Sequence, residues 1–153
     1  RSVTLPEDVK DALRVRGIFA ELADDISSKL RREGMLAGAV QVQIKDNTFK
    51  TSQYQKKLSN PTRIADELLS AAIGLVHSNN ALCVPARLVG MTACDLVGED
   101  EGFQLSFDFD QTHADSMEQL GSRVDGLRDK YGKRIIRRAS QLNSEQKESK
   151  DKK

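Results

Sequence analysis

The chain has 153 residues, of which 38% are hydrophobic and 31% charged, and its formal net charge at pH 7 is +1. This length fits one domain with a tail and excludes a two-lobed enzyme, and the composition is that of a soluble protein with a modest core. No apolar run approaches the ~18 residues that spanning a bilayer needs, which excludes a membrane span. Two cysteines are too few for a disulfide scaffold and lack a metal-ligand spacing, so we expect a reduced, cytoplasmic protein without a bound metal.

The charges are segregated along the chain. Residues 1–97 carry a net charge of +2, residues 98–122 carry −7 with no Lys or Arg, and residues 123–153 carry +6. Such blocks indicate a domain followed by tails that meet partners, although they could instead serve only to keep the chain in solution. The chain begins without an initiator Met or a signal peptide, so we expect a fragment of a longer protein.

The first predicted helix ends at approximately Glu33. Thr4 and Glu7 have the spacing of a capping box, and Pro6 is tolerated in a first helical turn. Gly34 is a typical residue at which a helix stops. The predicted core-facing stripe of this helix consists of Val9, Leu13, Phe19, Leu22, Ile26 and Leu30.

Two strands are expected next. From residue 39 the apolar residues Val40, Val42 and Ile44 alternate with polar ones, which predicts a half-buried strand. After a turn, a second strand is expected from approximately Thr48 to Lys57. Both of its faces are polar, with Lys50, Ser52, Tyr54 and Lys56 on one face and Thr51, Gln53 and Gln55 on the other. Such a strand is either an edge strand or one whose open face binds polar partners.

A second helix and a last strand complete the predicted domain. Asn60 and Pro61 predict the start of the helix, and His77 is interpreted as a solvated residue at its end. The buried stripe of this helix is predicted to contain Ile64, Leu68, Leu69, Ala72, Leu75 and Val76. The last strand is expected at Ala86–Leu96, with Val89, Met91 and Ala93 alternating with the residues of its other face.

These elements predict an α+β fold: a two-layer β-α-β-β-α-β domain in which two helices cover one face of an antiparallel sheet. The other face is left to solvent or to a partner. Its candidate residues are Gln41, Gln43, Lys45, Lys50, Tyr54, Lys56 and Thr92. This neutral-to-basic set of hydrogen-bond donors suits phosphates, while an ordinary solvated sheet face is an equal alternative.

A short apolar cluster lies inside the acidic block. The stretch from Glu101 to Asp110 reads EGFQLSFDFD, and its three Phe and one Leu cannot form a core of their own. An apolar cluster in an acidic linker is typical of a peptide that docks into a partner's pocket. The alternative is that these side chains fold back onto the domain.

A third helix is expected after this cluster. Ser116 is its expected cap, Gly132 its end, and its apolar residues are Met117, Leu120, Val124, Leu127 and Tyr131. The segment after it is basic, and the last residues are expected to be disordered. We therefore expect four parts: a domain at 1–97, an acidic linker with the peptide at 98–115, a helix and basic segment at 116–138, and a tail at 139–153.

The order of these segments resembles the C-terminal region of Y-family (translesion) DNA polymerases, a little-finger domain followed by a clamp-binding tail. The most similar members are bacterial, of the DNA polymerase IV and UV-damage-repair type. The segments that carry the resemblance are SVTLPEDV, LRREGMLAGAVQVQIKDNTFKTSQYQKKLSNPT, PARLVGMTACDLV, QLSFDF and RVDGLRDKYGKRIIRRAS. Together they cover nearly all of residues 1–140 in the family's order.

The resemblance implies a bacterial, cytoplasmic protein that binds duplex DNA without reading its sequence and is tethered to a sliding clamp. The DNA-binding residues would be Gln43, Lys45, Lys50, Tyr54, Lys56, Arg87 and Thr92. The clamp-binding residues would be Gln104, Leu105, Phe107 and Phe109.

Polymerase chemistry itself is not expected in this chain. It needs a carboxylate set that holds two Mg²⁺ ions, and the sequence shows neither such a set nor a Gly-rich phosphate loop or a nucleophile with a partnered His. We therefore expect no catalytic residue and no cofactor here, and Mg²⁺ in a catalytic part of the parent polymerase. The alternative function is a protein-interaction adaptor with a similar fold and no role on DNA.

Overall fold

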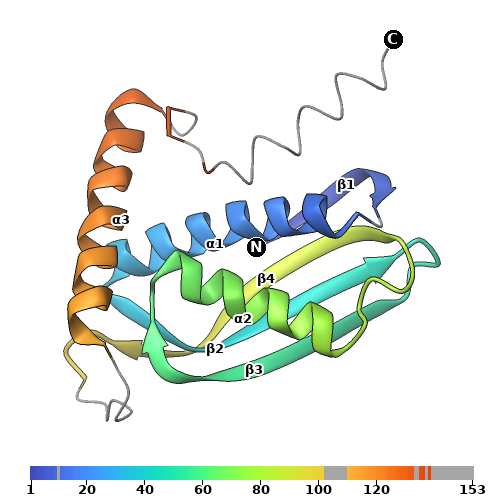
Figure 1. Ribbon diagram of the computed structural model, residues 1–153, viewed down its shortest axis with the longest axis horizontal. Coiled ribbons are helices and arrows are strands. Elements are labelled where there is room, and N and C mark those ends of the chain that lie inside the picture. The colour runs from blue at the N-terminus through green and yellow to red at the C-terminus, as the bar shows by residue number, and fades with distance from the viewer. Residues whose placement is uncertain (10, 102–109, 133–134, 137, 139–153) are drawn as a thin grey trace.

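A computed structural model describes residues 1–9, 11–101, 110–132, 135–136 and 138 of the chain. Its elements in chain order are β1 (Ser2–Val9), α1 (Ala12–Glu33), β2 (Met35–Asp46), β3 (Thr51–Thr62), α2 (Ala65–Ser78), β4 (Ala86–Gly98) and α3 (Gln111–Tyr131). The predicted α+β fold is confirmed: α1 and α2 lie side by side on one face of the sheet, and α3 stands at one end of this two-layer body (Figure 1).

The sheet has four antiparallel strands in the order β1-β4-β2-β3. Of the two interpretations of the polar second strand, the edge position is confirmed, because β3 pairs only with β2. The central strand β2 is paired on both sides, with Val42 opposite Tyr54 of β3 and Met91 of β4. This register fixes which side chains of the polar edge strand share a face with the core.

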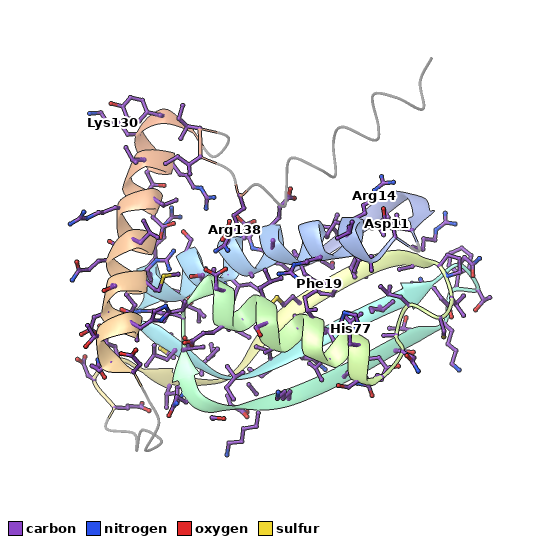
Figure 2. The ribbon with its side chains drawn as sticks, viewed as in Figure 1. Asp11, Arg14, Phe19, His77, Lys130 and Arg138 are labelled. Carbon is purple, nitrogen blue, oxygen red and sulfur yellow. The ribbon has the colours of Figure 1, made fainter. Side chains whose placement is uncertain are left out.

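The core lies between the two helices and the sheet. Phe19 of α1, Leu68 of α2, and Val42 and Met91 of the sheet are all at most 1% exposed. Phe19 lies between the two helices in Figure 2. Burying side chains of this size stabilises the fold by roughly 1.5–3 kcal/mol each. The apolar stripe predicted for the second helix is buried throughout, and so are Val40, Val42, Ile44 and Val89.

The start of α1 was predicted wrongly. Thr4 and Glu7 lie in β1, and the helix is capped by Asp11, whose carboxylate accepts a hydrogen bond from the backbone N–H of Leu13 at 3.0 Å. Residues 2–4 are extended because they pair with β4, and pairing with a distant strand outweighs a local capping signal. Leu13, expected in the core, is 71% exposed and lines a groove of about 450 Å³ between α1 and α2. The predicted end is confirmed, with Gly34 at φ 62°.

The start of α2 was also predicted wrongly. Asn60 and Pro61 lie in β3, directly before its last residue, and the N-cap position of α2 is Ile64. The hydroxyl of Thr62 accepts a hydrogen bond from the backbone N–H of Ile64 at 3.0 Å, and no side chain caps the first turn of α2. His77 is exposed in the last turn, as expected.

The third helix begins earlier than predicted and is held differently. Asp110 caps it rather than Ser116, so α3 starts inside the segment expected to be a linker, whereas its end at Gly132 is as predicted. Its apolar residues Leu120, Leu127 and Tyr131 are exposed. Ion pairs join it to α1 and to Arg63, which lies between β3 and α2.

Candidate nucleic-acid interface

The sheet face that α1 and α2 leave uncovered is defined by the register. In β2, Gln41, Gln43 and Lys45 alternate with the core residues Val40, Val42 and Ile44, so they point away from the helices. Their cross-strand partners point the same way. On β3 these partners are Thr51, Gln53 and Gln55, and on β4 they are Thr92, Gly90 and Leu88. We call these nine residues the open face.

Two of the predicted DNA-binding residues lie on the side of the sheet that faces the helices. Tyr54 pairs with Val42 and Lys56 pairs with Val40, so both side chains are on the helix side of β3, where Tyr54 packs against the core. Alternation in the sequence separates the two faces of a strand, but it does not show which one meets the helices. The assignment of Tyr54 and Lys56 to the open face was therefore wrong, and Gln53 and Gln55 take their place.

The open face is rich in amide and hydroxyl groups. The amides of Gln41 and Gln53 meet across the strands, with 3.4 Å between Nε2 and Oε1. No residue of the open face is an Asp or Glu, and Lys45 is its cation. Such a surface offers hydrogen-bond donors without repelling an anion. The predicted residues Gln43, Lys45 and Thr92 lie together on it.

Gly90 lies at the centre of the open face and has no side chain that projects from it. A Cβ atom at this position would lie 3.3 Å from Cβ of Ser2 and 3.5 Å from Cβ of Gln43. Any larger residue here would project from the face between its neighbours. The glycine therefore lets a partner approach the backbone closely at this point of the open face.

A rigid turn between β2 and β3 lies at one end of the open face. One carboxylate oxygen of Asp46 accepts hydrogen bonds from the hydroxyl and backbone N–H of Thr48 and from the backbone N–H of Lys50, at 2.6, 2.8 and 3.0 Å. These contacts, the Thr48 hydroxyl foremost, lower the pKa of Asp46. Lys50 thus lies in the turn, before the first residue of β3.

Two cations from different strands meet above one ring in this turn. The ammonium of Lys45 lies 5.1 Å from the centre of the Phe49 ring, and the guanidinium of Arg87 lies 5.0 Å from it. Arg87, which the sequence motif indicated, is thereby brought next to Lys45 at the edge of the open face. Phe49 was not among the predicted site residues, although a Phe in a polar turn was a visible signal.

The predicted clamp-binding residues Gln104, Leu105, Phe107 and Phe109 lie outside the described residues. The residues on both sides of them are described. Glu99 and Glu118 flank the segment in the chain, and both contact the side chain of Arg63. Arg63 therefore binds residues from both sides of the segment, next to the end of β3.

The sequence of the chain matches the profile of a known protein family. A sequence profile of the impB/mucB/samB family C-terminal domain matches residues 1–107. The chain belongs to this family. The resemblance to the little-finger domain of bacterial Y-family polymerases, which the motifs indicated, is confirmed.

Relatives of this impB/mucB/samB-type domain are bacterial DNA polymerases. The chain is 30% identical to DNA polymerase IV 1 of Bacillus subtilis, over 97% of the chain and 36% of the relative, and 32% identical to DNA polymerase IV of Oceanobacillus iheyensis, over 95% of the chain and 34% of the relative. The chain thus spans about a third of the length of these relatives.

A solved structure shares the fold. In a complex of the beta-clamp processivity factor with the little-finger domain of PolIV, the matching chain has a TM-score of 0.51 and 17% identity, over 71% of this chain and 96% of that one. At this identity the match supports the fold of the domain alone.

Neither a metal site nor a membrane span is found in the described part of this impB/mucB/samB-type domain. No group of three or more His, Cys, Asp or Glu residues there could hold a metal ion, so no described residue is assigned to Mg²⁺. None of the described helices is long and apolar enough to cross a bilayer.

Proposed function

We propose that this chain is the part of a bacterial translesion DNA polymerase that holds duplex DNA and tethers the enzyme to its sliding clamp. The observation that carries the proposal is the open face, which the helices leave uncovered, which has no carboxylate among its residues, and at one end of which Lys45 and Arg87 lie. The Mg²⁺-dependent polymerase reaction would take place in another part of the parent enzyme, in the bacterial cytoplasm.

The open face would bind the backbone of DNA and not its bases. Amide groups of Gln41, Gln43 and Gln53 can donate hydrogen bonds to phosphate oxygens, and Lys45 and Arg87 can neutralise phosphate charge. Phosphate contacts carry no sequence information, which suits an enzyme that must work on damaged templates. Because few of these groups are charged, the affinity should depend only moderately on salt, at about 0.9 in log–log slope for each phosphate neutralised.

A DNA titration tests this assignment. We expect the 153-residue chain to bind a short duplex of any sequence, and Lys45→Ala/Arg87→Ala to lower both the affinity and the salt slope. Lys56→Ala is the matched control, because Lys56 is exposed on the helix side of β3 and should leave binding unchanged. If the wild-type chain bound no DNA at any salt concentration, the adaptor function without a role on DNA would be favoured instead.

The clamp-tethering part of the proposal rests on the sequence of residues 104–109 and on the complex of a related little-finger domain with a clamp. Gln104 would bond at the rim of a pocket, while Leu105, Phe107 and Phe109 would be buried in it. Burial of large apolar side chains contributes about 1.5–3 kcal/mol each. Leu105→Ala/Phe107→Ala should therefore weaken binding to the beta clamp by tens-fold or more, measured by titration. Unchanged affinity in this double variant would rule out the tether.

A further inference from the structure

Phe49 has a conformation and an environment that the fold does not require. Its side chain is 61% exposed, and its backbone φ is 67°, in the left-handed region that a residue with a Cβ atom rarely adopts. Gly or Asn is the usual choice for such a position. An exposed aromatic ring and an unfavourable backbone conformation therefore occur in the same residue, and neither contributes to the core.

The turn that carries Phe49 is nevertheless rigid. Besides the hydrogen bonds accepted by the Asp46 carboxylate, the backbone N–H of Phe49 donates to the carbonyl of Asp46 at 3.1 Å. The backbone N–H of Asn47 donates to the carbonyl of Pro85 at 3.2 Å, which ties the turn to the start of β4. The ring is thus presented at a fixed position next to the open face.

The two cations beside this ring have no described carboxylate partner. Most arginines in contact with the helices are paired, such as Arg31 with Asp125 and Arg63 with Glu99 and Glu118. Lys45 and Arg87, by contrast, share only the ring of Phe49 among their described contacts. Two cations over one ring attract an anion, and the part of the ring that they leave exposed can stack on a planar group attached to that anion.

We propose that Phe49 stacks on an unpaired base of DNA while Lys45 and Arg87 hold the phosphates beside it. This inference rests on the proposed function and makes it more specific. In a continuous duplex the faces of the bases are stacked on one another and cannot reach an aromatic side chain. Aromatic rings flanked by cations are instead typical of single-strand binding, where each base offers a free face. The turn thereby recognises a junction between duplex and single strand, with the duplex on the open face.

Three DNA ligands separate the contribution of base stacking to binding from the contribution of phosphate charge. Fluorescence anisotropy would compare the 153-residue chain on a blunt duplex, on the same duplex with a single-stranded extension, and on one whose extension is abasic and carries the same phosphates. We expect the wild-type chain to prefer the extension with bases. Phe49→Asn should weaken binding to that ligand by about ten-fold and leave the other two ligands unaffected.

The backbone conformation of Phe49 provides the control for folding. Asn and Gly accept a φ of 67°, so Phe49→Asn and Phe49→Gly should not lower the melting temperature, although they lose the ring. Phe49→Tyr should retain the preference. Leu13→Asn, which removes another exposed apolar side chain on the helix side, should have no effect on DNA binding.

Each possible result decides between the two proposals. Duplex binding without any preference for the extension, or a preference that Phe49→Asn retains, would overturn the stacking role and leave the proposed function intact. An equal loss on all three ligands would also overturn it, because the ring would then only position Lys45 and Arg87. Absence of binding to every ligand would overturn the proposed function itself.

Discussion

The carboxylate of Glu118 in α3 accepts two hydrogen bonds from the guanidinium of Arg63, from Nε at 3.1 Å and from Nη2 at 2.7 Å. The same guanidinium donates to Glu99 from Nη1 at 2.7 Å and from Nη2 at 2.9 Å. Its side chain is 11% exposed, and the hydrogen bonds with Glu99 and then Glu118 raise its pKa. One arginine therefore binds the end of the sheet and α3 together, on both sides of the segment predicted to bind the clamp.

We predict that α3 is held mainly by charge. Glu118→Gln should increase hydrogen exchange of the α3 amides by roughly five- to thirty-fold, since a charge-assisted hydrogen bond at a partly exposed site contributes about 1–2 kcal/mol. Exchange in the sheet should not change. Asp115→Asn is the matched control, because the hydrogen bond described for Asp115 is with Gln111 of the same helix. Equal effects of the two variants would contradict the role of Arg63.

The contact between Arg63 and Glu99 predicts a pH dependence of stability. Hydrogen bonds from Arg63, and then its charge, lower the pKa of Glu99 in the folded protein. The stabilisation of the folded protein by this contact is therefore present above the unfolded pKa of Glu99, about 4.3. It is lost as the pH falls through the lower pKa that Glu99 has in the folded protein. The difference in free energy of unfolding between wild type and Glu99→Gln should be constant near neutral pH and shrink in this acidic window. Denaturant titrations of the two proteins across pH measure this difference.

A close approach of two strands predicts a strict need for glycine in β2. A Cβ atom at Gly38 would lie 2.7 Å from the backbone carbonyl oxygen of Asp95 in β4, whose own φ is 50°. Gly38→Ala should therefore destabilise the domain by about 1–3 kcal/mol, because backbone atoms must move. Gly74→Ala in α2 meets no atom within 4 Å and should stabilise by about 0.5–1 kcal/mol. Equal denaturation midpoints for the two variants would show that the backbone of β4 can shift at Asp95 without loss of stability.

The domain should fold without α3. The buried core cluster extends from Leu5 to Met91, and no residue of α3 belongs to it. A chain ending at Glu101 should melt in one cooperative transition, with a midpoint lowered by less than about 10 °C because Arg63 keeps Glu99 and loses Glu118. A truncated chain that is unfolded by circular dichroism would instead make α3 part of the folding unit.

The sequence by itself determined the fold class, the buried apolar stripe of α2 and the helix ends at Gly34 and Gly132. These depend on local periodicity and on the conformational freedom of single residues. Local signals failed at the three helix starts: Asp11 and Asp110 cap α1 and α3 in place of the predicted residues, and α2 begins at Ile64 without a side-chain cap. At the first two of these starts the predicted cap residues lie in β1 and β3, and the pairing of these strands with β4 and β2 through Thr4 and Thr62 outweighs one capping hydrogen bond.

Only the tertiary structure decided which residues form the open face. The alternation in the sequence places Tyr54 and Lys56 on one face of β3 and Gln53 and Gln55 on the other. Both sets are polar, so β3 has no apolar face that shows which side meets the helices. The pairing of Tyr54 with Val42 orients it, because residues directly opposite in a sheet share a face. The cluster of Lys45, Phe49 and Arg87 likewise depends on β2 and β4 lying side by side. Residues 38 positions apart meet there through a register that no local pattern contains.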